Sequence, residues 1–484
     1  MIRRHVATIG SRQVHYRRLG SGPALVLLHQ SPRSSLEMVP LMTRLAEAYT
    51  VFAPDTPGNG MSDPLPGETL GMTDFGDALA EFLTAVGVAR ALVYGFHTGA
   101  MCAFAIAWRH PDRVAGAIVN GYVHPGAEER ADLEAHYFAP FRPDWSGSHL
   151  AWAWARMREQ YIFYPWYRKD ASARIAMQAP TLERIHEDVM DLMRAGDSYR
   201  TPYRAAFTMD LVTAASEIKT PTLIMTMRQD WPLLPHLAHI APPSRAVTVA
   251  VPDSFAEAMT LLDAALARDA AGASLPAPAA TDLPPGDRAR GHFVGLDGGD
   301  LFLRFDIAGD DVPVVVLHDA GGSSADAMVA AGRSWLAFDL PGHGESDDFG
   351  GMVDPEATAA LIGTALDRLG IAVVDLIGLG AGGAVAAALA VARPNLVRRL
   401  TADTPEASAY PDYPLEAGGL HLLRAWGDVR DQALYDAGGA DPAALDPARL
   451  QQRVVDRMKA RGAAPDFARA AAAYRPAPAL AAAL

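Results

Sequence analysis

The chain of 484 residues has a single cysteine, Cys102, so it cannot form an internal disulfide framework. It also lacks an apolar stretch long enough to span a bilayer without charges or helix breakers. The first residues, Met1 to Val6, lack the apolar core of a secretory signal, and we expect a cytoplasmic location. Basic residues are too few to balance the acidic ones, and the formal net charge is -14. This charge argues against nucleic acid or an anionic membrane as a partner.

Signals for a metal or a cofactor are also missing. The histidines do not show a ligand spacing such as His-x-x-x-His on one helix, so no metal site is expected. The stretch Gly378 to Gly383 has some likeness to a dinucleotide fingerprint, but a lone glycine pattern is weak evidence. We therefore predict that the protein uses no cofactor.

The length of the chain exceeds that of one ordinary core, which predicts two domains. Apolar runs such as Pro23 to His29 alternate with helical patterns such as Thr73 to Val86, which predicts a mostly parallel sheet. From about 126 to 216 only helical patterns occur. Residues 269–290 are rich in Ala, Pro, Gly and Asp without an apolar period, and we predict a linker there.

One short stretch combines a predicted strand, a tight turn and a predicted helix. An apolar run, Ala91 to Tyr94, is followed by Gly95-Phe96-His97-Thr98-Gly99 and then by an Ala-rich helical pattern. A strand, a Gly-x-X-x-Gly turn and a helix form a nucleophile elbow, whose middle residue projects above the sheet. An esterase would carry serine at this position, whereas this chain carries His97.

Together with two other motifs, the elbow resembles the α/β-hydrolase superfamily. Leu27 to Pro32 (Leu-Leu-His-Gln-Ser-Pro) is similar to its His-Gly-x-Pro loop. Phe52 to Asp63 contains Asp-Thr-Pro-Gly-Asn-Gly-Met-Ser, which is similar to its Asp-x-Pro-Gly-x-Gly-x-Ser loop. The resemblance implies an α/β fold in which residues 126–216 form a helical cap.

The same motifs then occur again, in the same order. Val314 to Asp319, Phe338 to Asp347 and Asp375 to Gly383 match them, and the second elbow reads Gly-Leu-Gly-Ala-Gly around Gly380. We therefore predict two tandem α/β-hydrolase domains with caps, residues 1–268 and 291–484. The second is truncated before its last two strands, so its sheet should present an exposed edge. Contact with the first domain, or with another copy in a homo-oligomer, would cover that edge.

The resemblance also implies a catalytic triad in the chain order nucleophile, acid, histidine. His97 holds the nucleophile position and Asp230 the acid position, but the loop after the last strand reads Pro252-Asp253-Ser254-Phe255. A Ser-His-Asp mechanism is thus excluded for the first domain. We predict instead a hydrogen bond between His97 and Asp230, with His97 as a general base.

The oxyanion of such a reaction needs backbone N–H groups, which the resemblance places at Ser31 and Thr98. In the second copy Gly380 stands at the nucleophile position, and the strands that would carry an acid and a histidine are missing. We predict that this copy is a structural or regulatory pseudo-domain.

Aromatic residues are dense in the first part of the cap. They either pack the cap onto the core or line an apolar pocket, and His149, repeated as His421, either contacts a ligand or helps to begin a helix. The predicted substrate contacts are His149, Trp152, Trp154 and Trp231. Two functions remain open. One is hydrolase or lyase-like chemistry on a small apolar or aromatic substrate, and the other is an inactive pseudo-hydrolase that binds a ligand or acts as a scaffold.

Overall fold

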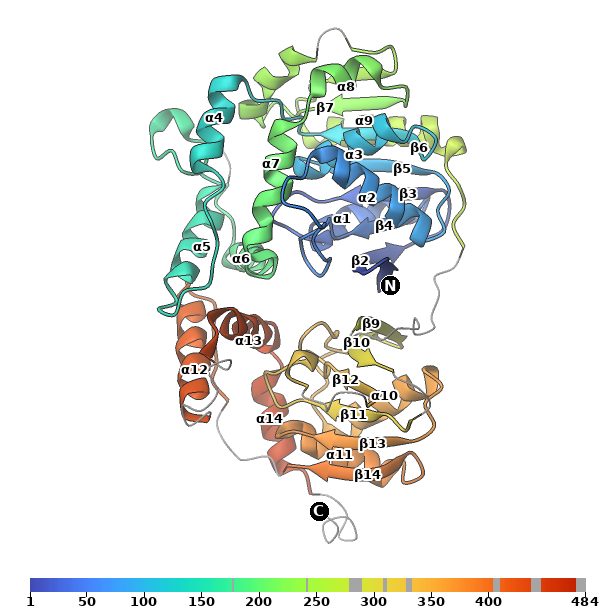
Figure 1. The fold of residues 1–484 in the computed structure, drawn as a ribbon, viewed down its shortest axis with the longest axis vertical. Helices are drawn as coiled ribbons and strands as arrows, with labels where there is room; N and C mark the ends of the chain where they lie inside the picture. Colours follow the sequence, from blue (N-terminus) through green and yellow to red (C-terminus); the bar gives the residue numbers. More distant parts are fainter. Residues whose placement is uncertain are drawn as a thin grey trace. The chain divides into compact units, whose positions relative to one another are not determined.

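The computed structural model describes residues 1–175, 178–240, 243–277, 290–307, 311–327, 333–403, 410–436 and 445–475 (Figure 1). The chain divides into two compact units. The first comprises Met1–Asp144 and Ser148–Ala279, and the second comprises Trp145–Gly147 and Ala280–Leu484.

The first unit is built around an eight-stranded mixed sheet of order β1-β2-β4-β3-β5-β6-β7-β8. Strands β3 to β8 pair in parallel, and the hairpin of β1 and β2 joins them antiparallel through β4. All residues of β3, β4, β6 and β7 are buried, which explains their continuous apolar runs. The strands are β1 (Arg3–Ile9), β2 (Arg12–Leu19), β3 (Ala24–Leu28), β4 (Thr50–Pro54), β5 (Ala91–Phe96), β6 (Val114–Asn120), β7 (Thr222–Met225) and β8 (Val247–Ala250).

Helices α1 (Val39–Leu45), α2 (Met72–Ala85), α3 (Thr98–Arg109) and α9 (Phe255–Asp269) flank this sheet (Figure 1). Helix α1 follows directly on a 3-10 turn, Ser35–Met38. Pro40 lies in the first turn of α1, where its missing N–H costs nothing.

Between β6 and β7 the regular elements of the described chain are helices and 3-10 turns, apart from the isolated bridge between Phe163 and Arg174, as expected for a cap. Helix α7 packs against both α2 and α3 and so connects the cap to the core. Helix α5 packs against α6. The cap helices are α4 (Ala127–His136), α5 (Ser148–Glu159), α6 (Leu182–Ala195), α7 (Arg200–Thr208) and α8 (Leu211–Glu217).

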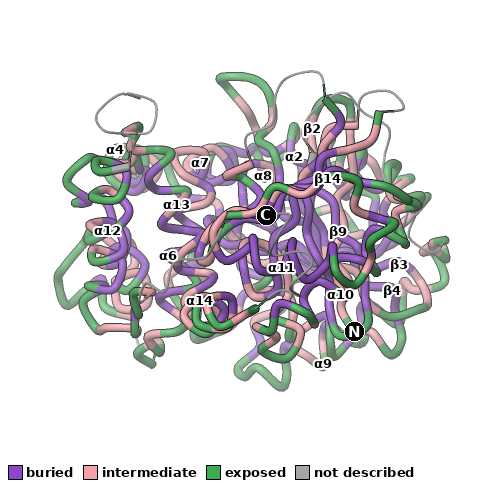
Figure 2. The backbone as a smooth tube through the Cα atoms, turned by 90° about the horizontal axis from the view of Figure 1, so that it is seen from below, coloured by how far each residue is buried: buried purple, intermediate pink, exposed green. Residues whose placement is uncertain are grey.

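The second unit contains a six-stranded sheet of order β14-β13-β11-β12-β10-β9. Its strands are β9 (Arg290–Leu296), β10 (Gly299–Asp306), β11 (Val314–Leu317), β12 (Trp335–Phe338), β13 (Val374–Gly378) and β14 (Val397–Ala402). Its helices are α10 (Pro355–Arg368), α11 (Ala381–Ala392), α12 (Leu420–Asp436), α13 (Pro447–Ala460) and α14 (Ala464–Ala473). Buried residues are concentrated in the inner strands of the two sheets, whereas the edge strands β1, β8 and β14 contain none (Figure 2).

Strand β14 forms the edge of the second sheet that the sequence predicts to be exposed, and charged side chains lie along it. Its counterpart in the first unit, β6, is entirely buried because β7 pairs with it. No residue of β14 is buried, and Arg398 and Arg399 are both exposed. The guanidinium of Arg398 binds Asp375 of β13 at 2.7 Å. Charged side chains on an edge strand discourage pairing, so this edge does not need an apolar partner.

The predicted linker is shorter at its start than its composition indicated. Helix α9 continues to Asp269, and the Ser274 amide donates to the carbonyl of Arg90 at 2.8 Å. The Ala24 amide in turn donates to the carbonyl of Ser274. Residues 270–277 are therefore attached to the first unit by backbone bonds, which leave no side-chain pattern in the sequence. Residues 278–289 lie outside the described part.

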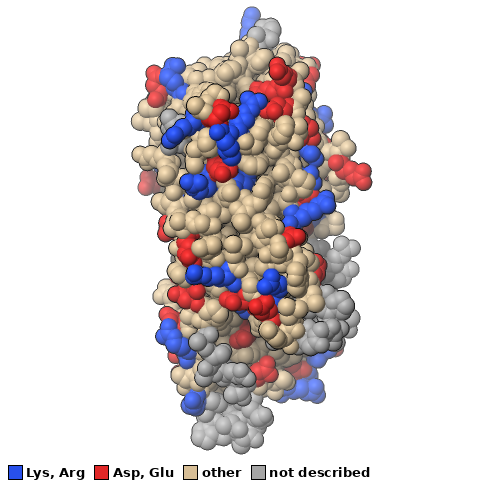
Figure 3. All heavy atoms as spheres, turned by 90° about the vertical axis from the view of Figure 1, so that its left-hand side faces the viewer, with Lys and Arg blue, Asp and Glu red and all other residues tan. Residues whose placement is uncertain are grey.

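Acidic and basic side chains are interspersed on the face shown in Figure 3. None of the helices in the described ranges is long and apolar enough to cross a membrane.

Candidate functional site

The turn between β5 and α3 has the backbone conformation of a nucleophile elbow. His97 lies between the two elements with φ 48° and ψ -111°. Among the described residues, Phe349 is the one other non-glycine with positive φ. A Cβ atom on Gly99 would overlap the carbonyls of Leu28 and His29, so glycine allows α3 to begin directly against the end of β3. The second elbow repeats this conformation, with φ 52° and ψ -121° at Gly380.

The hydrogen bond predicted between His97 and Asp230 is present. His97 Nε2 lies 2.9 Å from Asp230 Oδ2, in the loop that follows β7. The imidazole crosses the end of β6 to reach this carboxylate, and a Cβ atom on Gly121 would overlap the ring. A carboxylate accepts from Nε2–H, which leaves Nδ1 as the basic nitrogen. The side chains of His97 and Asp230 are 29% and 28% exposed, so small molecules can reach the pair.

The amides of Ser31 and Thr98 are the predicted oxyanion donors, and they belong to the loop after β3 and to the start of α3. Thr98 is the first residue of α3, and Ser31 follows β3. In the described part of the chain, neither amide donates a hydrogen bond to another residue. Tyr203 of α7 donates to the carbonyl of Ser31, which fixes the peptide from the cap side. The side chain of Gln30, the residue before Ser31, donates through Nε2 to Glu37 at 2.7 Å.

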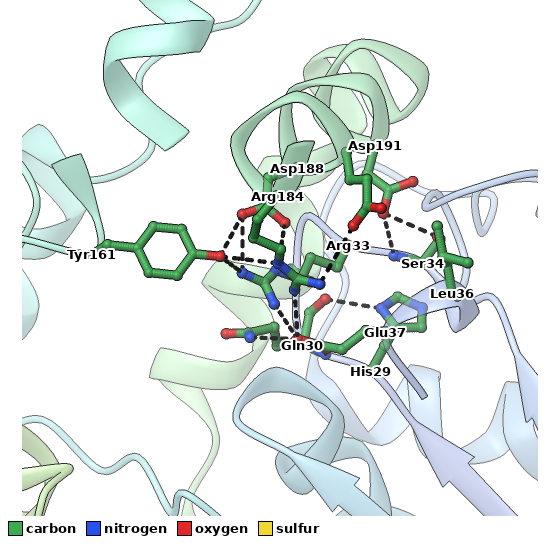
Figure 4. A network of polar contacts seen from close by, with 12 residues as sticks. His29, Gln30, Arg33, Ser34, Leu36, Glu37, Tyr161, Arg184, Asp188 and Asp191 are labelled. Carbon is green, nitrogen blue, oxygen red and sulfur yellow. Dashed lines mark hydrogen bonds and ion pairs between the residues drawn. The ribbon is translucent and has the colours of Figure 1, made fainter. Parts of the chain in front are cut away.

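A buried polar cluster, here called the cap network, joins the loop after β3 to the cap (Figure 4). Arg33 donates to Glu37 at 2.5 Å, to Asp188 of α6 at 3.0 Å and to the hydroxyl of Tyr161. The Tyr161 hydroxyl donates in turn to Asp188 at 2.7 Å, and Arg184 Nε lies 3.3 Å from the same carboxylate. Burial opposes the charge of Arg33, but Glu37 and Asp188 outweigh it and raise the pKa of Arg33. The network therefore holds the loop that carries Ser31.

A second contact between the same loop and α6 involves Ser34. Both its amide and its hydroxyl donate to Asp191 Oδ2 at 3.0 Å. Burial raises the pKa of Asp188 to about 6 and that of Asp191 to about 7. The second unit has a matching bond, from the Ser323 hydroxyl to Asp456 at 2.8 Å. Sequence reasoning missed these contacts, because their partners lie more than 100 positions apart and no local motif marks them.

The hydrogen bond made by His149 fits the alternative in which this residue helps to begin a helix. Its Nδ1 accepts the backbone N–H of Asp144 at 3.0 Å, just before α5. His421 does the same for Glu416 at 3.4 Å, just before α12. Burial lowers the pKa of both histidines to about 4, which suits a neutral acceptor. These repeated histidines therefore hold the backbone segment that precedes a helix.

The predicted aromatic substrate contacts fall into two groups. Trp152 stacks on Phe141 at 5.7 Å and meets Trp166 edge-on at 6.0 Å, so its ring contacts lie within the cap. Trp154 is buried in α5, with 4% exposure. Trp231, directly after Asp230, is 43% exposed. A role in substrate binding for these three residues, and for His149, stays a prediction.

A metal centre was not expected, and within the described ranges no three or more His, Cys, Asp or Glu residues are grouped to hold an ion. The loop after β8, where the family's histidine would lie, carries Asp253 and Ser254, and the Ser254 hydroxyl accepts from the amide of Glu257 at the start of α9. This serine caps a helix and is not placed as a base.

Two segments of the chain, residues 23–238 and 313–480, match the family model of the alpha/beta hydrolase fold. The chain therefore belongs to the α/β-hydrolase fold family. One relative, the 2-(acetamidomethylene)succinate hydrolase of Mesorhizobium japonicum, is 30% identical over 110 residues, which cover 23% of this chain and 39% of that protein. Another, the soluble epoxide hydrolase of a Corynebacterium strain, is 30% identical over 155 residues, covering 30% of this chain and 53% of that protein. The chain thus spans about half or less of these relatives.

The solved structure of an E-2-(acetamidomethylene)succinate hydrolase is similar in fold, with a TM-score of 0.40 and 22% identity. The match covers 55% of this chain and 98% of that one.

Proposed function

We propose that the first unit is an enzyme that performs hydrolase or lyase-like chemistry on a small molecule, with His97 and Asp230 as a catalytic dyad. The observation that carries the proposal is the 2.9 Å bond between the two side chains. In this arrangement one histidine takes the place of the serine and histidine of a triad. Gly121 supports it, because any larger residue would occupy the path of the ring.

In the proposed reaction His97 acts as a general base. Asp230 holds the imidazole with Nε2–H toward the carboxylate, so that Nδ1 can take a proton from a water molecule or from the substrate. The carboxylate then stabilises the imidazolium that forms. Negative charge that develops on the substrate oxygen is held by the amides of Ser31 and Thr98, at the positive end of α3. An apolar or aromatic substrate remains the expectation from the aromatic cap.

The alternative is a pseudo-hydrolase that binds a ligand without turnover. It is favoured by the lack of a histidine in the loop after β8, which reads Pro252-Asp253-Ser254-Phe255 and whose Ser254 serves as a helix cap. Under this alternative His97 fills the elbow and no proton is transferred.

The two functions are separated by a screen of esters, lactones and carbon–carbon cleavage substrates with purified full-length protein. His97→Ala and Asp230→Asn should each lower the rate by about 10²- to 10⁴-fold, the usual effect of losing a general base. A matched control exists in the same unit, because His110 Nε2 bonds to Asp77 at 2.7 Å with comparable side-chain exposure of 30% and 41%. His110→Ala should leave the rate unchanged. Unchanged turnover in both dyad variants would exclude the dyad.

A further inference from the structure

In the second unit, the backbone amides at the elbow donate hydrogen bonds to a side chain of the same unit, Asp319. Asp319 follows β11, and its Oδ1 accepts the amide of Ala320 at 2.8 Å and the amide of Ala381 at 2.7 Å. Ala381 is the first residue of α11, and Ala320 lies two positions after His318. These are the positions of Thr98 and Ser31 in the first unit.

The loops that carry these amides are held in the same way in both units. His29 Nε2 accepts the amide of Thr56 at 2.9 Å, and His318 Nε2 accepts the amide of Leu340 at 3.0 Å. Both histidines also bond through Nδ1 to the carbonyl of the next residue. The two units therefore share the histidine bonds that hold this loop, and these bonds do not explain why a carboxylate binds the amides in the second unit alone.

The difference comes from two positions that change together. Gly380 has no side chain, and a Cβ atom there would overlap the carboxylate of Asp319. In the first unit the elbow residue is His97, and the counterpart of Asp319 is Gln30, whose amide and side chain both donate to Glu37. A side chain at the elbow and a carboxylate on the amides thus exclude each other.

We propose that Asp319 is a built-in anionic ligand of the second elbow, which closes that site to external carboxylates and other oxyanions. The inference concerns the second unit and does not depend on catalysis in the first. The carboxylate sits where a substrate oxyanion would sit, at the N-terminus of a twelve-residue helix. Because Asp319 is tethered beside the amides, its effective concentration exceeds that of any dilute anion, even though the residue is exposed to solvent.

The proposal is tested by hydrogen exchange on the full-length protein, followed in peptides that cover residues 316–324 and 376–390. Asp319→Ala should speed exchange at the start of α11 by at least tenfold. Sodium acetate should reverse this change saturably, with half-saturation between about 1 and 100 mM for so small a ligand, relative to sodium chloride at equal ionic strength. The wild type should not respond to acetate in these peptides. An equal response in both proteins, or unchanged exchange in Asp319→Ala, would overturn the proposal.

A second measurement starts from a protein in which Asp319 is retained. Gly380→Ala should expel the carboxylate sterically, so it should speed exchange in the same peptides in the wild-type background. The same substitution should have a much smaller effect in Asp319→Ala, where no carboxylate remains to be expelled. The backbone strain of alanine at Gly380 is common to both backgrounds and cancels in this comparison. Equal effects in the two backgrounds would show that Asp319 does not occupy the elbow.

Discussion

Replacing Asp191 by asparagine should change how the stability of the first unit depends on pH. Asparagine keeps a carbonyl oxygen that can accept from the amide and hydroxyl of Ser34, the two donors that Asp191 binds at 3.0 Å. It therefore resembles the protonated carboxyl in shape and charge. Burial raises the pKa of Asp191 to about 7, with a smaller contribution from Asp55 and Asp188, while Arg194 and Ser34 act in the opposite direction.

The sign and size of the effect follow from proton linkage. An unfolded aspartate ionises near 3.8, whereas folded Asp191 ionises near 7. Between these pH values the folded protein holds a proton that the unfolded chain has lost, so stability falls as the pH rises. A difference of about 3 in pKa corresponds to about 4 kcal/mol, at about 1.4 kcal/mol for each unit of pKa. Wild type and Asp191→Asn should be similarly stable near pH 3, below the unfolded pKa, and the variant should be more stable near pH 8.

The measurement is thermal unfolding of the full-length protein at a series of pH values, with the wild type subtracted from the variant. For a unit of this size, about 4 kcal/mol corresponds to roughly 10 °C in the unfolding temperature. Glu183→Gln is the matched control, since Glu183 is an exposed carboxylate on the same helix and should give a flat difference curve. A flat curve for Asp191→Asn would refute the reasoning, as would a variant that gains stability toward acid.

Three further predictions concern the elbow and the cap network. Gly121→Ala should displace the His97 ring and lower activity about as much as Asp230→Asn, as kinetics and a crystal structure of the variant would show. His97→Gly should unfold at the same or a higher temperature than the wild type while losing activity, because a non-glycine residue at φ 48° costs about 1 kcal/mol or more. Arg33→Ala should destabilise the first unit by about 3–5 kcal/mol in denaturant unfolding, since it leaves Glu37 and the buried Asp188 with the partly exposed Arg184 as their remaining ion-pair partner among the described residues. Arg184→Ala should cost less, because that side chain is 33% exposed.

The sheet could be predicted from the sequence because buried parallel strands leave continuous apolar runs. The apolar run Pro23 to His29, for example, contains β3 (Ala24–Leu28), all of whose residues are buried. The boundary after α9 could not be predicted in this way. Residues 270–277 are fixed by backbone bonds to Arg90 and Ala24, and alanine, serine and leucine in that stretch carry no pattern that signals them.

Part of the candidate site could likewise be predicted from the sequence, and part could not. His97 and Asp230 could be paired from sequence because the family's chain order assigns a place to each of them. The cap network could not, because Arg33 and Asp188 are charged residues of a kind that normally faces water, and only the packing of α6 brings them together. His149 shows the opposite case. The pattern around it fitted either a ligand or a helix start, and its bond to Asp144 corresponds to the second.

Comparison with the second unit shows which features of the first elbow support a catalytic role for His97. A histidine in a left-handed backbone conformation invites a catalytic interpretation, because such strain is often kept at active sites. Gly380 has nearly the same dihedral angles, however, in a unit where no side chain projects from the elbow. The conformation therefore belongs to the fold and would persist without catalysis. What sets His97 apart is its surroundings, namely the carboxylate of Asp230 within 2.9 Å and the space left by Gly121. The proposed chemistry rests on those two features, and the backbone strain adds nothing to it.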